Sequence, residues 1–143
     1  MVVVQLIVLL IIHQLKYVQK ISLVIWGNVM PEKPEVITVV SSLKTRLIGS
    51  RITGCNIYWD NIIAYPVSSE FKKKIIGQKI NDITTRGKFI VMLLDDYSLL
   101  VHLRMEGKFM FRNVGDVLSK HEHVELILDD KVSFRFHDTL LRL

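Results

Sequence analysis

The chain has 143 residues and a formal net charge of +5, and half of its residues are hydrophobic. This length can bury the core of one domain, and the composition excludes an intrinsically disordered chain. The basic balance favours polyanionic partners such as nucleic acid without proving them. The single cysteine, Cys55, excludes an internal disulfide and a multi-cysteine zinc site. We expect Cys55 to be a small buried residue on a strand.

Residues 1–29 differ from the rest because they contain no acidic residue and begin with the apolar run 1–12. That run is shorter than the about 20 residues of a membrane-spanning helix, and it lacks the basic start and cleavage motif of a signal peptide. A membrane-surface anchor stays open. We favour the interpretation that the translation start is mis-assigned and that Met30 is the true start. The codons for Trp26-Gly27 are rich in guanine, like a bacterial ribosome-binding site, and they lie just before Met30. Peptides from residues 1–29 in the native product would refute Met30 as the true start.

A helix is the first element predicted after Met30. Prolines and acids at Pro31–Glu35 are typical of a helix entry, where proline suits the first turn and acids suit the positive end of the helix dipole. Apolar residues at helical spacing then predict an amphipathic helix over 34–48, with Gly49 as its end. These apolar residues are Val36, Val39, Val40, Leu43 and Leu47.

Beyond this helix the apolar pattern changes to period two, which is typical of strands. Asp95-Asp96 and Asp129-Asp130 indicate tight turns. Residues 68–76 predict a short helix that is capped by a serine and ends at Gly77. The predicted strands cover 51–58, 79–86, 88–95, 98–104, 108–112, 123–128 and 131–137. The order predicts an α+β fold that is mainly β, an antiparallel β-sandwich with an N-terminal amphipathic helix packed against it.

The string from Met30 to Val36 carries a possible chemistry. If the chain began at Pro31, this residue would present a secondary amine with a pKa near 8, and attack on a sugar carbon would form an iminium ion that withdraws electrons. Glu32 would lie beside the amine to donate and accept protons. Inside a longer chain the same nitrogen is an unreactive amide. The string is also common as a helix cap, so both interpretations stay open on this string alone.

The same string resembles the MPELPEV opening of the bacterial formamidopyrimidine-DNA glycosylases (Fpg, MutM), with Lys33 in place of the usual leucine. Four further segments resemble family motifs in the same order. These are 85–89 (TRGKF, family RRGKY), 101–107 (VHLRMEG, family IHLGMSG), 120–124 (KHEHV, family KHDHV) and 134–138 (FRFHD, family LRYTD). The resemblance covers residues 30 to about 139, and five ordered motifs make it specific.

The resemblance implies catalytic roles for residues near the start of the domain. Pro31 would be the nucleophile that forms a Schiff base with the damaged nucleotide, and Glu32 would be the proton donor. Glu35 would support them at the start of the helix. Lys88 would reach the phosphate and sugar from a hairpin and assist proton transfer. A solvated turn lysine is the alternative for Lys88.

The resemblance also implies a set of DNA-binding residues. Met105 would be the wedge that fills the gap left by a flipped-out lesion, although a core methionine is the alternative. His121 and His102 would contact the DNA. Arg142 stands where the family has a wedging phenylalanine, and after a slip in register it would replace a missing DNA-contacting arginine. The pair His121 and His123 has no third ligand beside it, so we expect no metal site.

The implied reaction is base-excision repair of double-stranded DNA that contains an oxidised purine, such as 8-oxoguanine or formamidopyrimidine, or an abasic site. The enzyme would be a bifunctional DNA glycosylase and AP lyase that releases the base and then cleaves the strand by β/δ-elimination. The resemblance implies no cofactor for this step. We expect a monomer in the bacterial cytoplasm, associated with the nucleoid, without a membrane partner.

The resemblance ends where the family continues Asp-Pro-Arg-Arg-Phe-Gly, because this sequence reads Asp138-Thr139-Leu140-Leu141-Arg142-Leu143. The family's second domain, a helix–two-turn–helix with a four-cysteine zinc finger, has no counterpart here. We therefore expect residues 30–143 to be an incomplete catalytic domain without zinc. Two alternatives stay open. One is a catalytically dead DNA-binding remnant of the family, and the other is a membrane-associated protein of unrelated role.

Overall fold

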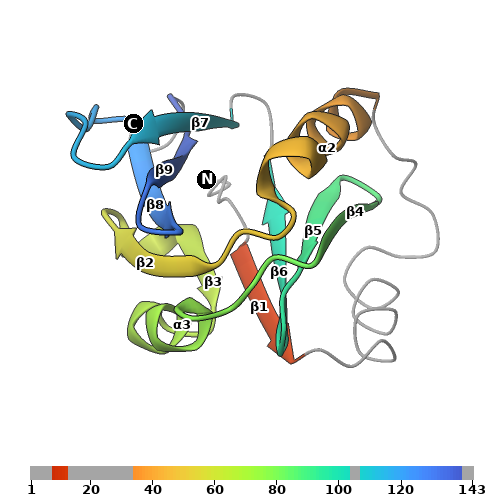
Figure 1. The fold of residues 1–143 in the computed structure, drawn as a ribbon, viewed down its shortest axis with the longest axis horizontal. Coiled ribbons are helices and arrows are strands. Elements are labelled where there is room, and N and C mark those ends of the chain that lie inside the picture. Colours follow the sequence, from red (N-terminus) through yellow and green to blue (C-terminus); the bar gives the residue numbers. More distant parts are fainter. Residues whose placement is uncertain (1–7, 13–33, 104–106, 140–143) are drawn as a thin grey trace, which may run out of the picture.

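The computed structural model describes residues 8–12, 34–103 and 107–139. Its elements are ordered along the chain as drawn in Figure 1. They are β1 (Val8–Ile12), α2 (Pro34–Leu47), β2 (Ile52–Ile57), the 3-10 helix η1 (Asp60–Ile62), β3 (Ile63–Tyr65), α3 (Ser68–Ile75), β4 (Asp82–Arg86), β5 (Phe89–Leu93), β6 (Tyr97–His102), β7 (Lys108–Asn113), β8 (Glu122–Leu128) and β9 (Val132–His137).

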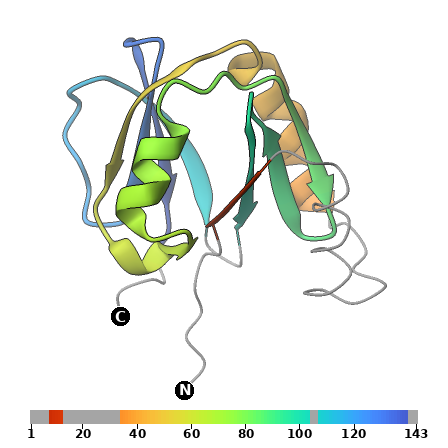
Figure 2. The same cartoon turned by 90° about the horizontal axis from the view of Figure 1, so that it is seen from below.

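The strands form two sheets that pack against each other as a sandwich (Figure 2). One sheet has five strands in the order β3-β1-β6-β5-β4, and the other has four in the order β2-β8-β9-β7. The strand pairs are antiparallel except β1 with β3. Helix α2 lies along β4 and β5, and α3 lies along β2 and β3 (Figures 1 and 2). The predicted α+β sandwich with a packed N-terminal helix is confirmed.

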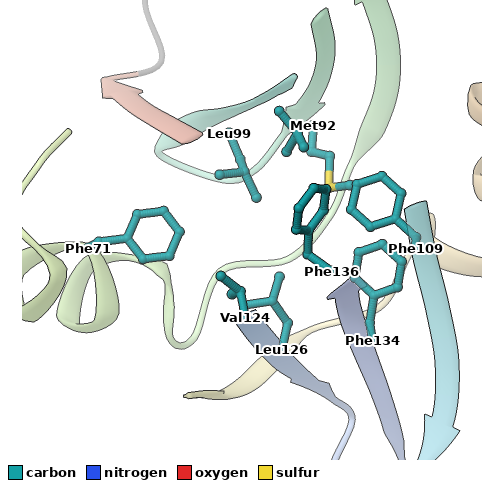
Figure 3. A pocket seen from close by; sticks show the side chains of 9 residues that line it. Phe71, Met92, Leu99, Phe109, Val124, Leu126, Phe134 and Phe136 are labelled. Carbon is teal, nitrogen blue, oxygen red and sulfur yellow. The ribbon is translucent and has the colours of Figure 1, made fainter. Parts of the chain in front are cut away.

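The core between the sheets is apolar and closely filled. Phe134 and Phe136 of the four-stranded sheet face Met92 and Leu99 of the five-stranded sheet (Figure 3). The cavity between them encloses about 30 Å³ and is lined by apolar side chains alone. That volume has room for very few water molecules, so the cavity is not a site for a nucleotide.

Helix α2 confirms the predicted amphipathic helix and ends one residue earlier than expected, at Leu47. Val36, Val40, Leu43 and Leu47 are buried, and their spacing keeps them on one face of the helix. The helix ends because Gly49 adopts a φ of 91°, a left-handed conformation that glycine tolerates best. The Gly49 amide then donates to the Ile80 carbonyl at 2.8 Å, which directs the chain toward β2.

The predicted serine cap of the second helix is wrong. Ser68 is the first residue of α3, and Val67 occupies the N-cap position without a side-chain hydrogen bond. The Ser68 hydroxyl instead donates to the Asp60 carbonyl at 3.5 Å. Because η1 passes beside the start of α3, the hydroxyl binds a neighbouring segment and not its own helix.

Strand β4 is shorter than the predicted strand 79–86, and a tight turn explains the difference. The backbone amide of Lys79 donates to the Asp95 carboxylate at 3.1 Å, and the Gln78 side chain donates to Asp96 at 2.9 Å. Since residues before Asp82 bind this turn, only a single bridge joins Lys79 to Arg51 before the regular ladder with β5 begins.

Residues 8–12 form a strand inside the five-stranded sheet, although the sequence indicated only an apolar extension there. Strand β1 lies between β6 and β3 (Figure 1). The short strand β3, which the sequence pattern did not predict either, pairs with β1 in parallel. Among the described residues, no helix is both long and apolar enough to cross a membrane.

Candidate functional site

The predicted lysine hairpin is confirmed as a tight connection between β4 and β5. Arg86 and Phe89 pair across the strands, so Gly87 and Lys88 alone form the turn. Gly87 has a φ of 60°, which the turn requires and glycine supplies without strain. Lys88 therefore lies at the tip of a tight hairpin, half-exposed to solvent.

His102 lies at the same end of the five-stranded sheet as Lys88. It is the last residue of β6 and pairs with Phe89, the neighbour of Lys88. The rings of Phe89 and His102 meet edge to face, with centroids 4.9 Å apart. The sheet register thus brings together two residues that are separated by a whole strand in the sequence.

The connection from β6 to β7 leaves from this end of the sheet. The Gly107 amide donates to the Leu103 carbonyl at 2.9 Å and closes the connection. A Cβ at position 107 would lie 2.1 Å from the Leu103 carbonyl oxygen, so only glycine fits there. Met105, the predicted wedge, lies outside the described residues between these two anchors.

The start of α2 approaches the same corner of the molecule. Helix α2 packs on β4 and β5, and in Figures 1 and 2 its first turn lies on the side of the hairpin tip. Glu35 belongs to this first turn. Pro31 and Glu32 lie outside the described residues, and three residues of chain can extend only about 10 Å from Pro34.

His121 lies at the adjoining end of the four-stranded sheet and is held through its backbone. Its amide donates to the Ser119 hydroxyl at 3.1 Å, and its carbonyl accepts from the Asp138 amide at 3.0 Å. Its ring lies 5.7 Å from that of His137. Burial, together with the positive charges of Lys108 and His121, lowers the pKa of His137. His121 is half-exposed beside a histidine that favours the neutral form.

A buried arginine, Arg135 on β9, holds the loop that leads to His121. Its side chain is 1% exposed and lies 3.3 Å from a Glu122 oxygen and 3.4 Å from a Glu125 oxygen. It also donates to the carbonyls of Asp116 at 2.7 Å and Val117 at 3.1 Å. The loop 114–121 is therefore fixed over the outer face of the four-stranded sheet through two of its own carbonyls.

Glu125 remains ionised inside this network. Burial by itself raises the pKa of its carboxyl, but hydrogen bonds from Ser133, Asn56 and Tyr58, with the charge of Arg135, hold that pKa below its usual value. Burial and the hydrogen bond to Glu125 in turn raise the pKa of Tyr58 to about 12. Glu125 and Arg135 are therefore an ion pair inside this network.

Sequence reasoning did not single out this network. Ser133 and Arg135 alternate with Phe134 and Phe136, and such alternation is typical of a strand with one face in solvent. The position of Arg135 between Phe134 and Phe136 was the available signal of this network. The sequence pattern could not show that a loop covers Arg135, because that contact arises only in the tertiary structure.

Three of the predicted site residues, Lys88, His102 and His121, lie at neighbouring ends of the two sheets. Pro31, Glu32, Met105 and Arg142 lie outside the described residues. Within the described part of the chain, no three His, Cys, Asp or Glu side chains gather in a way that could hold a metal ion. Cys55 is buried on β2 as predicted, and burial raises the pKa of its thiol to about 12.

Comparison with known proteins gives a consistent result. Residues 30–141 match the family model of the formamidopyrimidine-DNA glycosylase N-terminal domain. The formamidopyrimidine-DNA glycosylase of Oceanobacillus iheyensis is 39% identical over 110 residues, which are 76% of this chain and 39% of the relative. The Bacillus subtilis relative is 40% identical over 110 residues, again 76% of this chain and 40% of the relative. The chain thus spans about two fifths of the length of these curated relatives.

Solved structures agree with the sequence matches. The Lactococcus lactis formamidopyrimidine-DNA glycosylase, non-covalently bound to DNA with an AP site, superimposes with a TM-score of 0.71 at 29% identity, over 75% of this chain and 41% of that one. The L. lactis enzyme with Fapy-dG DNA gives a TM-score of 0.69 at 29% identity, over 73% of this chain and 39% of that one. Residues 30–141 of this chain belong to the formamidopyrimidine-DNA glycosylase family, as its N-terminal domain.

Proposed function

We propose that this chain carries the catalytic half of a base-excision repair enzyme, a DNA glycosylase and AP lyase acting on oxidised purines in double-stranded DNA. The observation that carries the proposal is the start of the family match at residue 30, directly before Pro31 and Glu32. Its substrates would be 8-oxoguanine and formamidopyrimidine in duplex DNA, together with abasic sites.

The chemistry requires Pro31 to be the first residue, so that its nitrogen is an amine. At a damaged nucleotide the amine attacks the anomeric carbon, and the bond to the base breaks as Glu32 supplies a proton. At an abasic site the amine condenses with the sugar aldehyde and releases water. On the first route the iminium ion forms when the sugar ring opens, as the C1′–O4′ bond breaks and O4′ takes a proton. On both routes the iminium ion acidifies the adjacent C–H bond and allows β- and then δ-elimination of the phosphates.

The described residues support this assignment of roles. Lys88 stands at the tip of a tight hairpin, and α2, which begins three residues after Pro31, packs against the strands of that hairpin. His102 and His121 lie at neighbouring sheet ends, where a DNA backbone would pass Lys88. Met105 and Arg142 would complete the DNA contacts, and Glu35 would support Pro31 and Glu32.

We assign this function to the bacterial cytoplasm, in association with the nucleoid and with the protein as a monomer. The support is that the similar curated relatives are bacterial enzymes with a DNA substrate in their name. DNA is a polyanion, and the net charge of +5 is compatible with it.

The test is borohydride trapping on duplex DNA with an abasic site. Borohydride delivers hydride to the iminium ion and leaves a stable covalent amine. Two forms of the protein are compared, one beginning at Met1 and one beginning at Pro31 after removal of Met30. We expect the Pro31 form to become covalently attached to the DNA and the Met1 form to stay unattached, because its proline nitrogen is an amide.

Each other outcome has a distinct meaning. Attachment of the Met1 form with its residues 1–30 intact would show that another amine reacts, and the proposed mechanism would be wrong. If neither form attaches while both bind duplex DNA, the chain is a DNA-binding remnant of the family. A pH series sharpens the test, since attachment by Pro31 should increase as the pH rises through the amine pKa, near 8.

A further inference from the structure

Strand β1 occupies a position that the family match leaves unassigned. The match begins at residue 30, whereas β1 comprises Val8–Ile12. Nevertheless β1 is an interior strand, with β6 on one side and β3 on the other (Figure 1). Without β1 the five-stranded sheet would divide into β6-β5-β4 and the three residues of β3.

The backbone direction of β6 shows which of its groups depend on β1. The Leu94 amide donates to the Tyr97 carbonyl at 2.8 Å, so the backbone groups of Tyr97 point toward β5. Successive residues of a strand direct these groups to opposite sides. The backbone amides and carbonyls of Leu99 and Val101 therefore also point toward β5, whereas those of Ser98 and Leu100 point toward β1.

The register between β1 and β6 identifies the residues of β1 that pair with Ser98 and Leu100. Leu100 lies opposite Leu9, and Ser98 lies opposite Ile11. These are the positions where β1 and β6 exchange backbone hydrogen bonds. Ser98 and Leu100 are both completely buried, with 0% exposure. This burial holds with β1 in place, and an empty position would leave their amides and carbonyls on an unpaired strand edge, a feature that proteins usually cover or protect.

We propose that the edges of β6 and β3 form a strand-acceptor site, which binds an extended, uncharged, proline-free segment antiparallel to β6, and that residues 8–12 are its occupant. The sequence VLLII has the composition of a strand in a sheet that is buried on both faces, where apolar residues do not alternate with polar ones. Residues 8–12 are then part of the folded domain. This site does not depend on the proposed enzymatic function.

The site links the N-terminal segment to the chemistry proposed for Pro31. Removal of residues 1–30 would convert the Pro31 nitrogen from an amide to an amine. The same removal would empty the acceptor site and leave β6 with an unpaired edge, which is open to any other extended strand. A chain that keeps residues 1–30 has β1 in its five-stranded sheet, but its Pro31 nitrogen is an unreactive amide. A chain that begins at Pro31 has the reactive amine but lacks β1.

Hydrogen exchange on the full unmodified chain tests the site, with neighbouring amides of one strand as the internal control. The amides of Leu99 and Val101 point toward β5 and should be protected in any case. We expect the amides of Ser98 and Leu100 to be protected to a similar degree. Exchange of Ser98 and Leu100 at the rate of an open strand edge, with Leu99 and Val101 still protected, would overturn the proposal.

A substitution in β1 identifies the occupant. Leu9→Pro removes the amide that faces Leu100, and Gln14→Pro, beyond the strand, is the matched control. In the Leu9→Pro chain, exchange at Ser98 and Leu100 should accelerate by about tenfold or more, with little change at Leu99 and Val101. General loss of protection in the Leu9→Pro chain alone would also support β1 as the strand that completes the sheet. Unchanged protection at Ser98 and Leu100 would show that another segment fills the site.

Discussion

Both sheets of the sandwich carry buried side chains on their outer faces as well as in the core between them, but these outer side chains are of different kinds. In the five-stranded sheet, Phe89, Val91 and Leu100 form a second apolar cluster on the face away from the main core. In the four-stranded sheet the outer face carries Arg135 and Glu125, which the loop 114–121 covers.

This difference separates two ways of stabilising a sheet. Apolar contacts are not directional, so they stabilise the five-stranded sheet in proportion to the area buried. Buried charges need particular partners, so the four-stranded sheet depends on geometry. We infer that the apolar sheet supplies a rigid platform for Lys88, while the charged network fixes the loop that carries His121. The following predictions test this comparison in order of decreasing effect on stability.

The largest effect is expected for Arg135→Met in the four-stranded sheet. The substitution keeps much of the side-chain volume but leaves the carboxylates of Glu122 and Glu125 buried without their cation. Removing one partner of a buried ion pair costs about 3–5 kcal/mol. Urea denaturation should show this loss in the free energy of unfolding. Arg112→Met, an exposed position on β7 of the same sheet, is the matched control, and an equal loss in both variants would contradict the role of the network.

A smaller loss is expected for Leu100→Ala in the five-stranded sheet. Leu100 is completely buried beside Phe89 and Val91, so the substitution leaves a cavity. Large-to-small changes of this kind cost about 2–5 kcal/mol, depending on how far the surroundings collapse. The loss should be independent of salt and of pH, in contrast to that of Arg135→Met. A strong pH dependence of the Leu100→Ala loss would show that the two sheets are not stabilised differently.

Acid should weaken the four-stranded sheet through Glu125. The pKa of its carboxyl in the folded protein lies below the usual value of about 4.5, so its contribution is fully present above about pH 4.5. The contribution is lost as the pH falls through the lower folded value. Glu125→Gln should therefore flatten the pH dependence of unfolding below about pH 4.5. A profile in the Glu125→Gln chain as steep as in the unmodified chain would assign the acid sensitivity to other groups.

The smallest effect on stability is expected for Lys88→Met, because its half-exposed side chain lies at the tip of the hairpin. The free energy of unfolding should change by no more than about 0.5 kcal/mol. Borohydride trapping by the form that begins at Pro31 should nevertheless fall by about a hundredfold, the usual lower range for a lost proton-transfer group. Lys131→Met, in the exposed β8–β9 turn, is the control and should leave trapping intact.

Much of the fold could be predicted because its signals are local. The spacing of Val36, Val40, Leu43 and Leu47 determines one buried helix face, and Gly49 marks its end. Asp129 and Asp130 adopt positive φ values of 51° and 58°, as expected of the tight turn predicted there. The hairpin position of Lys88 came from the family resemblance of the segment 85–89, and the pairing of Arg86 with Phe89 confirms that hairpin.

Two features required the tertiary structure. Arg135 is buried because the loop 114–121, distant in sequence, folds over its face of the sheet, and alternation within β9 cannot report what covers that face. Residues 8–12 have the composition of a buried strand, but only the pairing with β6 and β3 assigns them a position in the sheet. Period and composition describe a segment by itself, whereas its partners are determined by the packing of the whole chain.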